Sequence, residues 1–186
     1  MTRVSLLARS PSTHFGAYHG RARSAAAGSA AAAVWAFQEP LDRRLISSDY
    51  SDVAVLGKAV TNGRWWWPAG FAMHLVNGAL FGLAYHEARR RWPARPRALG
   101  VGLALGEHVA LYPLCYLVDR FHPRRGAPGV PALLGNRKAF LQATWRHAVF
   151  GLVLGATSQC TACAPIMSLP RYVRRPLLLP SGMPCC

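Results

Sequence analysis

Four stretches of the chain are rich in apolar residues, and polar segments separate them. They cover about residues 22–38, 65–85, 98–118 and 139–158. A helix needs about 20 mostly apolar residues to cross the hydrocarbon of a bilayer, so the pattern predicts an all-α, four-helix transmembrane bundle. The Ala-rich first stretch is the shortest and follows Arg21 and Arg23, a combination that also fits a signal peptide. We expect a retained helix, because its counterpart in the second half is retained.

One sequence pattern occurs in both the second and the fourth stretch. It has the form His-x-Val-x-Gly-x-x-x-Gly, and it begins at His74 and again at His147. An Asp-Arg pair precedes each copy, at Asp42 and at Asp119. Such an internal repeat predicts two helical hairpins related by symmetry. The two hairpins should be parallel, since both His-bearing helices would cross in the same direction. The Asp-Arg pairs are expected to cap helix ends at the membrane boundary.

The polar segments divide the chain into three regions. We expect a disordered basic N-terminus over 1–15, a membrane domain over 16–158 with polar loops at 39–64 and 119–138, and a disordered Pro/Cys-rich tail over 159–186, because repeated prolines interrupt a helix. Four crossings place both termini on one side. Lys and Arg number 12 on that side and 9 in the two loops on the other, which favours cytoplasmic termini.

Ionisable residues fall near the midpoint of three of the four stretches. A charge at this depth costs about 2.5–3.5 kcal/mol on insertion scales, so these side chains should face inward and pair. We predict an ion pair between Glu107 and Arg146, surrounded by histidines, with Gln142 one turn from Arg146. The predicted polar centre consists of His74, Asn77, Glu107, His108, Arg146 and His147.

Small residues spaced four apart predict close contacts between the helices. Each repeated histidine is followed by glycines at the fourth and eighth positions, on the same stripe of its helix. The third stretch carries a similar pair. The expected packing glycines are Gly78, Gly82, Gly102, Gly106, Gly151 and Gly155.

Composition agrees with a membrane location and argues against other classes. Only 16% of the residues are charged and 52% are apolar, whereas about a quarter of the residues in a soluble domain are charged. The net charge of +15 would suit nucleic acid, but the arginines cluster at the ends of the apolar stretches, where they meet lipid headgroups. We therefore expect no nucleic-acid partner. Four tail cysteines (Cys160, Cys163, Cys185 and Cys186) could hold zinc, but the tail has no visible scaffold, so no metal is predicted.

A stretch of about 80 residues resembles the YagU family of bacterial inner-membrane proteins. The matching positions are His74, Phe81, Tyr85, Trp92-Pro93, Gly100, His108 and Tyr112-Pro113-Leu114, with Phe140 and His147 matching more loosely. The resemblance implies a small multi-span protein with a link to acid resistance, and it singles out His74 and His108. The Gly151-x-x-x-Gly155 stripe, Arg146 and the tail depart from it. The chain is also similar to multi-span membrane proteins of actinobacteria.

Three functions remain open from the sequence. The first is a non-enzymatic protein of the bacterial inner membrane whose His/Glu/Arg centre responds to protons or an ion. The second is a membrane protein that binds haem or another metal cofactor through His74 and His147. The third is a structural scaffold that assembles with itself or with other membrane proteins. An enzyme is the least supported class, because no catalytic motif is present.

Overall fold

The chain folds into α-helices, and a longer loop over residues 122–136 precedes the last of them. The computed structural model describes the backbone of residues 12–167 and the side chains of residues 19–158. Within this part every regular element is helical, so the prediction of an all-α chain is confirmed. The elements are α1 (Ser12–Ile46), α2 (Asp52–Val60), η1 (Gly63–Trp65), α3 (Trp66–Arg91), α4 (Pro96–Leu111), η2 (Tyr112–Leu114), α5 (Cys115–Phe121) and α6 (Arg137–Met167).

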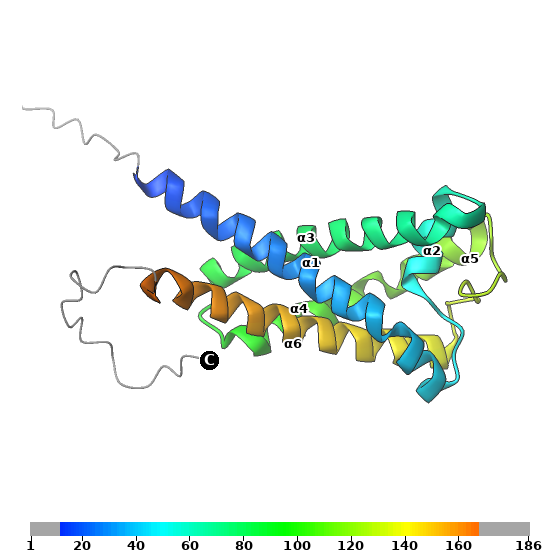
Figure 1. Cartoon of the computed structure of the whole chain (residues 1–186). Coiled ribbons are helices and arrows are strands. Elements are labelled where there is room, and N and C mark those ends of the chain that lie inside the picture. The colour runs from blue at the N-terminus through cyan, green and yellow to red at the C-terminus, as the bar shows by residue number, and fades with distance from the viewer. Residues whose placement is uncertain (1–11, 168–186) are drawn as a thin grey trace, which may run out of the picture.

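Two helical hairpins form the body of the molecule (Figure 1). Helix α1 packs along α3, helix α4 packs along α6, and α1 and α6 join the two pairs, whereas α3 and α4 scarcely touch each other. The start of α1, the end of α6 and the short α3–α4 connection lie at one end of the molecule, and α2 and α5 lie at the other (Figure 1). The two hairpins therefore leave a gap in the bundle on the side where α3 faces α4.

Glycines set the spacing inside each hairpin. A Cβ atom on Gly78 would lie 2.6 Å from the carbonyl oxygen of Gly28 in α1, and one on Gly151 would lie 2.5 Å from that of Gly100 in α4. Both distances are far below van der Waals contact, so the backbones approach this closely only because these residues lack a side chain. Gly82 and Gly155 also face a neighbouring helix backbone.

Two of the expected packing glycines, both in the third stretch, contact no other helix within the described part of the chain. A Cβ atom on Gly102 or on Gly106 would meet nothing within 4 Å. The glycine of α4 that contacts α6 is Gly100. Spacing alone predicts which residues share a stripe, but the position of the partner helix decides which stripe is buried.

Three predicted boundaries also differ from the structure. Residues 39–64, expected to be a loop, contain the last turns of α1 and all of α2. Helix α1 begins at Ser12, inside the segment 1–15 that was expected to be disordered, and it continues through Pro40. Helix α6 continues to Met167, beyond the expected end at 158. The rest of the predicted disordered segments, residues 1–11 and 168–186, lies outside the described residues.

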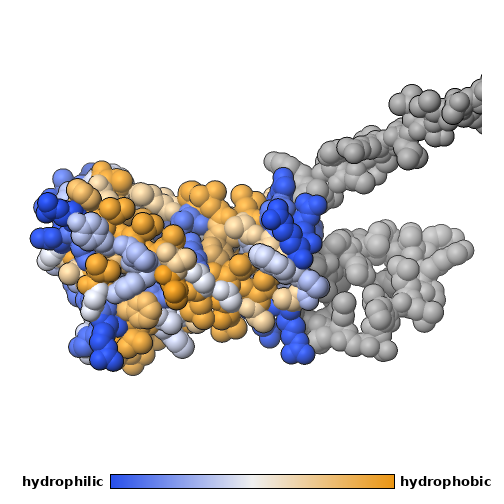
Figure 2. Space-filling view, turned by 180° about the vertical axis from the view of Figure 1, so that it is seen from behind, coloured by the Kyte–Doolittle hydropathy of each residue, from blue (hydrophilic) through white to orange (hydrophobic). Residues whose placement is uncertain are grey.

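The interior is small, and much of the outer surface is apolar. The core consists of Ala27, Ala31, Ala32, Trp35, Tyr85, Ala104, Phe150 and Leu154. Four long helical segments make up the body: α1, α3, the run from α4 to α5, and α6. Large apolar side chains are exposed on each of them, among them Phe37, Val76, Leu80, Leu117, Leu141 and Trp145. Figure 2 shows apolar residues over the middle of the molecule and hydrophilic residues at its two ends. By length and composition, one stretch of the described chain, Pro96–Phe121, is long and apolar enough to cross a membrane.

Candidate functional site

Arg146 is the most buried charged residue, and it binds carboxylates that differ from the predicted one. Its side chain has no exposed surface. Its Nε and Nη2 atoms donate to the two carboxylate oxygens of Asp42 at 2.6 Å each, and its Nη1 donates to Asp52 at 2.7 Å and to Glu39 at 3.3 Å. The predicted ion pair between Glu107 and Arg146 is therefore wrong. We call Glu39, Asp42, Asp52 and Arg146 the arginine cluster.

The arginine cluster ties α6 to α1 and to the start of α2. Ser51 is the N-cap of α2, since its hydroxyl oxygen accepts a hydrogen bond from the Ala54 amide. The Ser51 hydroxyl in turn donates to Glu39 at 2.6 Å, and the Asp52 amide donates to the other oxygen of Glu39 at 2.9 Å. Buried polar groups are stable when they are hydrogen-bonded in this way. Gln142 donates to Asp42 at 2.7 Å, so it joins this cluster as well.

Two carboxyl groups of the cluster lie outside the predicted spans and have shifted pKa values. Burial, followed by the negative charge of Asp52, raises the pKa of Glu39 to about 7. Burial would also raise the pKa of Asp52, but the attraction of Arg146 and hydrogen bonding outweigh it and lower that pKa. The cluster therefore balances Arg146 mainly with Asp42 and Asp52, while Glu39 holds the N-terminus of α2.

The Asp-Arg pairs do not share one role. Asp42 was expected to cap a helix end beside its neighbouring arginine, but it is buried and binds Arg146 instead. Asp119 accepts hydrogen bonds from the backbone amides of Leu133 and Leu134 at 2.8 Å each. It therefore fixes the loop that precedes α6.

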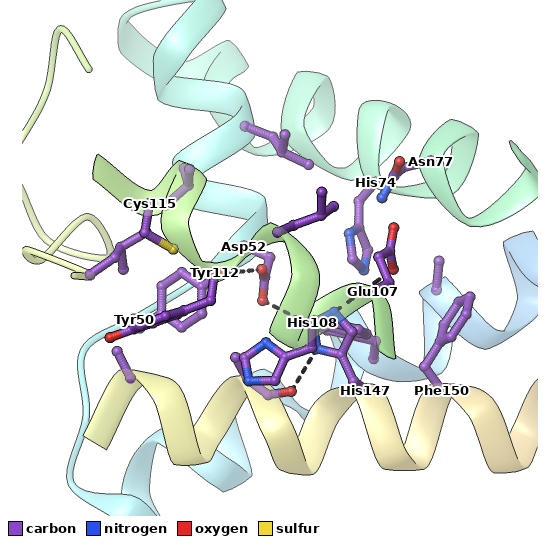
Figure 3. Close-up of a pocket in the computed structure, with 18 of the residues that line it drawn as sticks. Tyr50, Asp52, His74, Asn77, Glu107, His108, Tyr112, Cys115, His147 and Phe150 are labelled. Atoms are coloured by element: carbon purple, nitrogen blue, oxygen red, sulfur yellow. Dashed lines mark hydrogen bonds and ion pairs between the residues drawn. The ribbon is translucent and has the colours of Figure 1, made fainter. Parts of the chain in front are cut away.

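A cavity of about 250 Å³ lies beside the arginine cluster, between the two hairpins. Asp52 belongs to both, because its carboxylate lines the cavity and also binds Arg146. The polar residues that line it are Tyr50, Asp52, His74, Asn77, Glu107, His108, Tyr112, Cys115 and His147. Its apolar wall includes Trp35, Phe81, Leu111, Phe140 and Phe150. Figure 3 shows this arrangement, with side chains from α3, α4 and α6 directed toward one space.

Three imidazoles gather around Trp35 and one another. The Trp35 ring centroid lies 5.3 Å from that of His74 and 4.6 Å from that of His147. The His108 and His147 rings are 4.7 Å apart. The Trp35 indole nitrogen donates to Asp52 at 2.8 Å, so this side chain connects the histidines with the arginine cluster.

Hydrogen-bond partners indicate which nitrogen of each ring carries the proton. Nδ1 of His147 is 2.7 Å from the Ala143 carbonyl oxygen, an acceptor, so Nδ1 carries a hydrogen, and in the neutral ring Nε2 has the lone pair. His74 has a backbone hydrogen bond with Ala32, whereas its buried Nε2 has no partner. The Thr144 hydroxyl donates to the Phe140 carbonyl, so it accepts from Nε2 of His108. A neutral ring would therefore have its lone pair on Nε2 in His147 and on Nδ1 in His108.

Glu107 is the other carboxylate that lines the cavity. Its Oε2 lies 4.0 Å from Nε2 of His147, and its side chain keeps 33% of its surface exposed. Asn77 also lines the cavity from α3 and is exposed on its outer side. Of the six residues predicted as a polar centre, the structure therefore brings five to one cavity, while Arg146 points into the adjacent cluster.

Sequence reasoning missed the partners of Arg146 and the central tryptophan. Glu39 and Asp42 stand within one turn of each other on α1, and Asp52 begins the next helix. Three acids clustered after the first apolar stretch were a usable signal for the missing countercharge. Trp35 gave no signal in the sequence, because its role depends on the histidines that pack against it.

Comparisons with known proteins found no match to this chain among family models, curated proteins or solved structures. The site must therefore be interpreted from its own chemistry. Within the described residues, no three His, Cys, Asp or Glu side chains are placed so that they could hold a metal ion. The tail cysteines predicted to be incidental lie outside the described side chains.

Proposed function

We propose that this chain is a non-enzymatic, multi-span protein of the bacterial inner membrane, with four crossings and a proton-responsive cavity. Exposed apolar side chains on all four long segments support this reading, because soluble monomers rarely expose large continuous apolar surfaces. Segment 96–121 contains 26 residues, and α3 also contains 26. At 1.5 Å per residue each is about 39 Å long, enough to cross the hydrocarbon.

The ends of the molecule support an orientation with cytoplasmic termini. Arginines gather at the end that holds the start of α1 and the end of α6, at positions 21, 23, 89–91, 95 and 97. One acid, Glu87, accompanies them there, and it pairs with Arg21. The opposite end carries Lys and Arg as well, in segments 39–64 and 119–138. Over the whole sequence they number 9, against 12 on the side of the termini. The positive-inside rule favours the first end as cytoplasmic.

The observation that carries the proposed function is the group of three imidazoles beside the carboxylates of Glu107 and Asp52 in a cavity between the hairpins. Histidine titrates near pH 6.5 when unperturbed, so it can gain and lose a proton under physiological conditions. In neutral rings Nε2 of His147 and Nε2 of His74 are the atoms that would take up a proton, and Glu107 would stabilise a protonated His147 ring at close range. Ionisable groups inside membrane helices frequently mark proton or ion pathways.

Proton flux into liposomes tests this proposal. We expect the reconstituted protein to dissipate an imposed pH gradient faster than empty liposomes do, and His147→Asn to abolish the difference. His86→Ala is the control. His86 lies near the C-terminal end of α3, where it contacts Ser24 and does not line the cavity. Flux equal to that of empty liposomes, or unchanged flux in the His147 variant, would remove the proton-linked role.

Haem is not favoured at this site. Trp35 packs against both proposed axial ligands, His74 and His147. The cavity of about 250 Å³ is also below the range of roughly 300–1,000 Å³ that is usual for drug-sized ligands. The resemblance to the YagU family stays a prediction, although the two histidines that it singles out, His74 and His108, both line the cavity.

A scaffold that assembles through α4 is the second candidate. Gly102 and Gly106 form a flat outward face that contacts nothing in the monomer, and such a face allows a second helix to approach closely. Crosslinking in native membranes tests it. We expect Gly102→Leu to reduce a crosslinked dimer, whereas monomer alone in the parent protein would exclude self-association.

A further inference from the structure

The cavity presents hydrogen-bond acceptors without a matching cation. Nε2 of His74 is buried and has no partner, and Nε2 of His147 has only Glu107, at 4.0 Å. Both atoms are lone-pair acceptors in the tautomers assigned above. None of the described residues that line the cavity is Lys or Arg. Buried acceptors without donors are costly, so a bound group that donates hydrogen bonds would complete this site.

Of the two carboxylates that line the cavity, Asp52 is not available to such a group and Glu107 is. The Tyr50 hydroxyl, the Trp35 indole nitrogen and Arg146 all donate to Asp52, so its oxygens are already satisfied. No hydrogen bond to the carboxylate of Glu107 occurs within the described residues, and the His147 nitrogen nearest to it is an acceptor. The unmet charge of the cavity is therefore the charge of Glu107.

Aromatic rings make up much of the remaining wall. Phe81, Phe140 and Phe150 line the cavity together with Trp35 and Tyr112. The face of an aromatic ring attracts a cation electrostatically, most strongly where water is excluded. Rings beside a carboxylate therefore favour an organic cation over an anion, and their apolar surface favours a ligand with an apolar body.

The exposed lining residues locate the mouth of the cavity. Asn77 on α3 and Leu111 on α4 are both exposed, and Glu107 is partly exposed beside them. This is the side on which α3 and α4 scarcely touch. Val76 on α3 and Val109 on α4 are exposed as well. In the orientation proposed above, the mouth opens toward lipid rather than toward water, so a ligand would enter from the bilayer.

We propose that this cavity binds a small amphipathic amine in its protonated form, with the ammonium group donating to Glu107 and to the free Nε2 atoms of His74 and His147. This inference rests on the proposed function and names its ligand class. The other ionisable groups facing the ligand are Asp52 from α2, His108 from α4, Tyr50, Tyr112 and Cys115. The volume of about 250 Å³ suits a ligand of one ring, because a cavity of about 150 Å³ accommodates benzene.

Binding of benzylamine to the full chain in detergent tests the proposal. Benzyl alcohol is the matched neutral probe, since it has the same ring and nearly the same shape. Isothermal titration calorimetry should show benzylamine binding at least tenfold more tightly than benzyl alcohol, a difference of about 1.4 kcal/mol. Glu107→Gln should remove this preference, whereas Glu87→Gln, which alters an exposed carboxylate paired with Arg21, should retain it. Circular dichroism melting confirms that each variant is folded.

Three results would overturn the inference: equal affinity for the two probes, binding of neither probe, or an unchanged preference in the Glu107 variant. The proton-flux experiment decides separately whether the proposed function stands. Flux that depends on His147 without amine selectivity would refute the ligand class alone. Amine selectivity without flux would refute proton translocation, while the cavity remained a binding site.

Discussion

Replacing Arg146 by Met removes the buried cation that joins α6 to α1 and α2. Four of its hydrogen bonds to carboxylates disappear: two to Asp42 at 2.6 Å, one to Asp52 at 2.7 Å and one to Glu39 at 3.3 Å. Three carboxyl groups then remain together without a countercharge. Removing one partner of a buried pair typically costs about 3–5 kcal/mol, and we expect Arg146→Met to cost at least this much in the free energy of unfolding.

Reversible unfolding by denaturant in detergent micelles, followed by circular dichroism, measures this cost. Arg21→Met is the control, because the Arg21–Glu87 pair is exposed and should contribute little. Adding Asp42→Asn to the Arg146 variant should recover part of the loss, since it removes one uncompensated charge. If Arg146→Met unfolds at the same denaturant concentration as Arg21→Met, the arginine cluster does not hold the helices together.

Three further changes probe the packing, the cluster and the cavity. Gly28→Ala should lower the thermal stability markedly, because its Cβ would overlap the α3 backbone, whereas Gly102→Ala should leave it unchanged; equal melting of the two variants would contradict the hairpin contact. Because the pKa of Asp52 is lowered in the folded protein, its stabilising contribution is complete above about pH 4 and is lost as the pH falls further. The measurement is the melting temperature as a function of pH. A melting temperature of the parent protein that stays constant below pH 4, or one with the same pH dependence as in Asp52→Asn, would contradict this. Trp35→Phe loses the 2.8 Å bond to Asp52 and should cost about 1.5–3 kcal/mol in unfolding free energy; a smaller loss than in Phe81→Leu would argue against a central role for that bond.

The features of the fold that depend on local spacing could be predicted from the sequence. Apolar stretches and the repeated histidine pattern predict helices and two hairpins, and Gly78 and Gly151 make the close contacts expected of them. The gathering of His74, His108 and His147 follows from their matched depth along the chain. Each of these inferences needs only the rise and the periodicity of a helix.

The partner of Arg146 could not be predicted in the same way. Depth along the chain favoured Glu107, which lies at the midpoint of its stretch. In the structure α1 continues through Pro40, within the segment that the apolar pattern predicts to be a loop, and this brings Asp42 beside Arg146. The start of α2 then folds back and adds Asp52. These contacts depend on the course of a polar segment, and apolar periodicity contains no information about that course.

The central claim is that the molecule crosses the bilayer, with its two ends on opposite sides of the membrane and the cavity between them. The most direct test is to determine on which side of the membrane each end lies. Cysteines are introduced singly at Gly63, in the exposed turn before α3, and at Ala94, in the exposed connection between α3 and α4, on a background without native cysteines. Intact cells are treated with a maleimide that cannot cross the membrane. We expect labelling of Gly63→Cys from outside, and labelling of Ala94→Cys only after the membrane is permeabilised. Equal labelling of both positions in intact cells would contradict a membrane-spanning α3 and the account built on it.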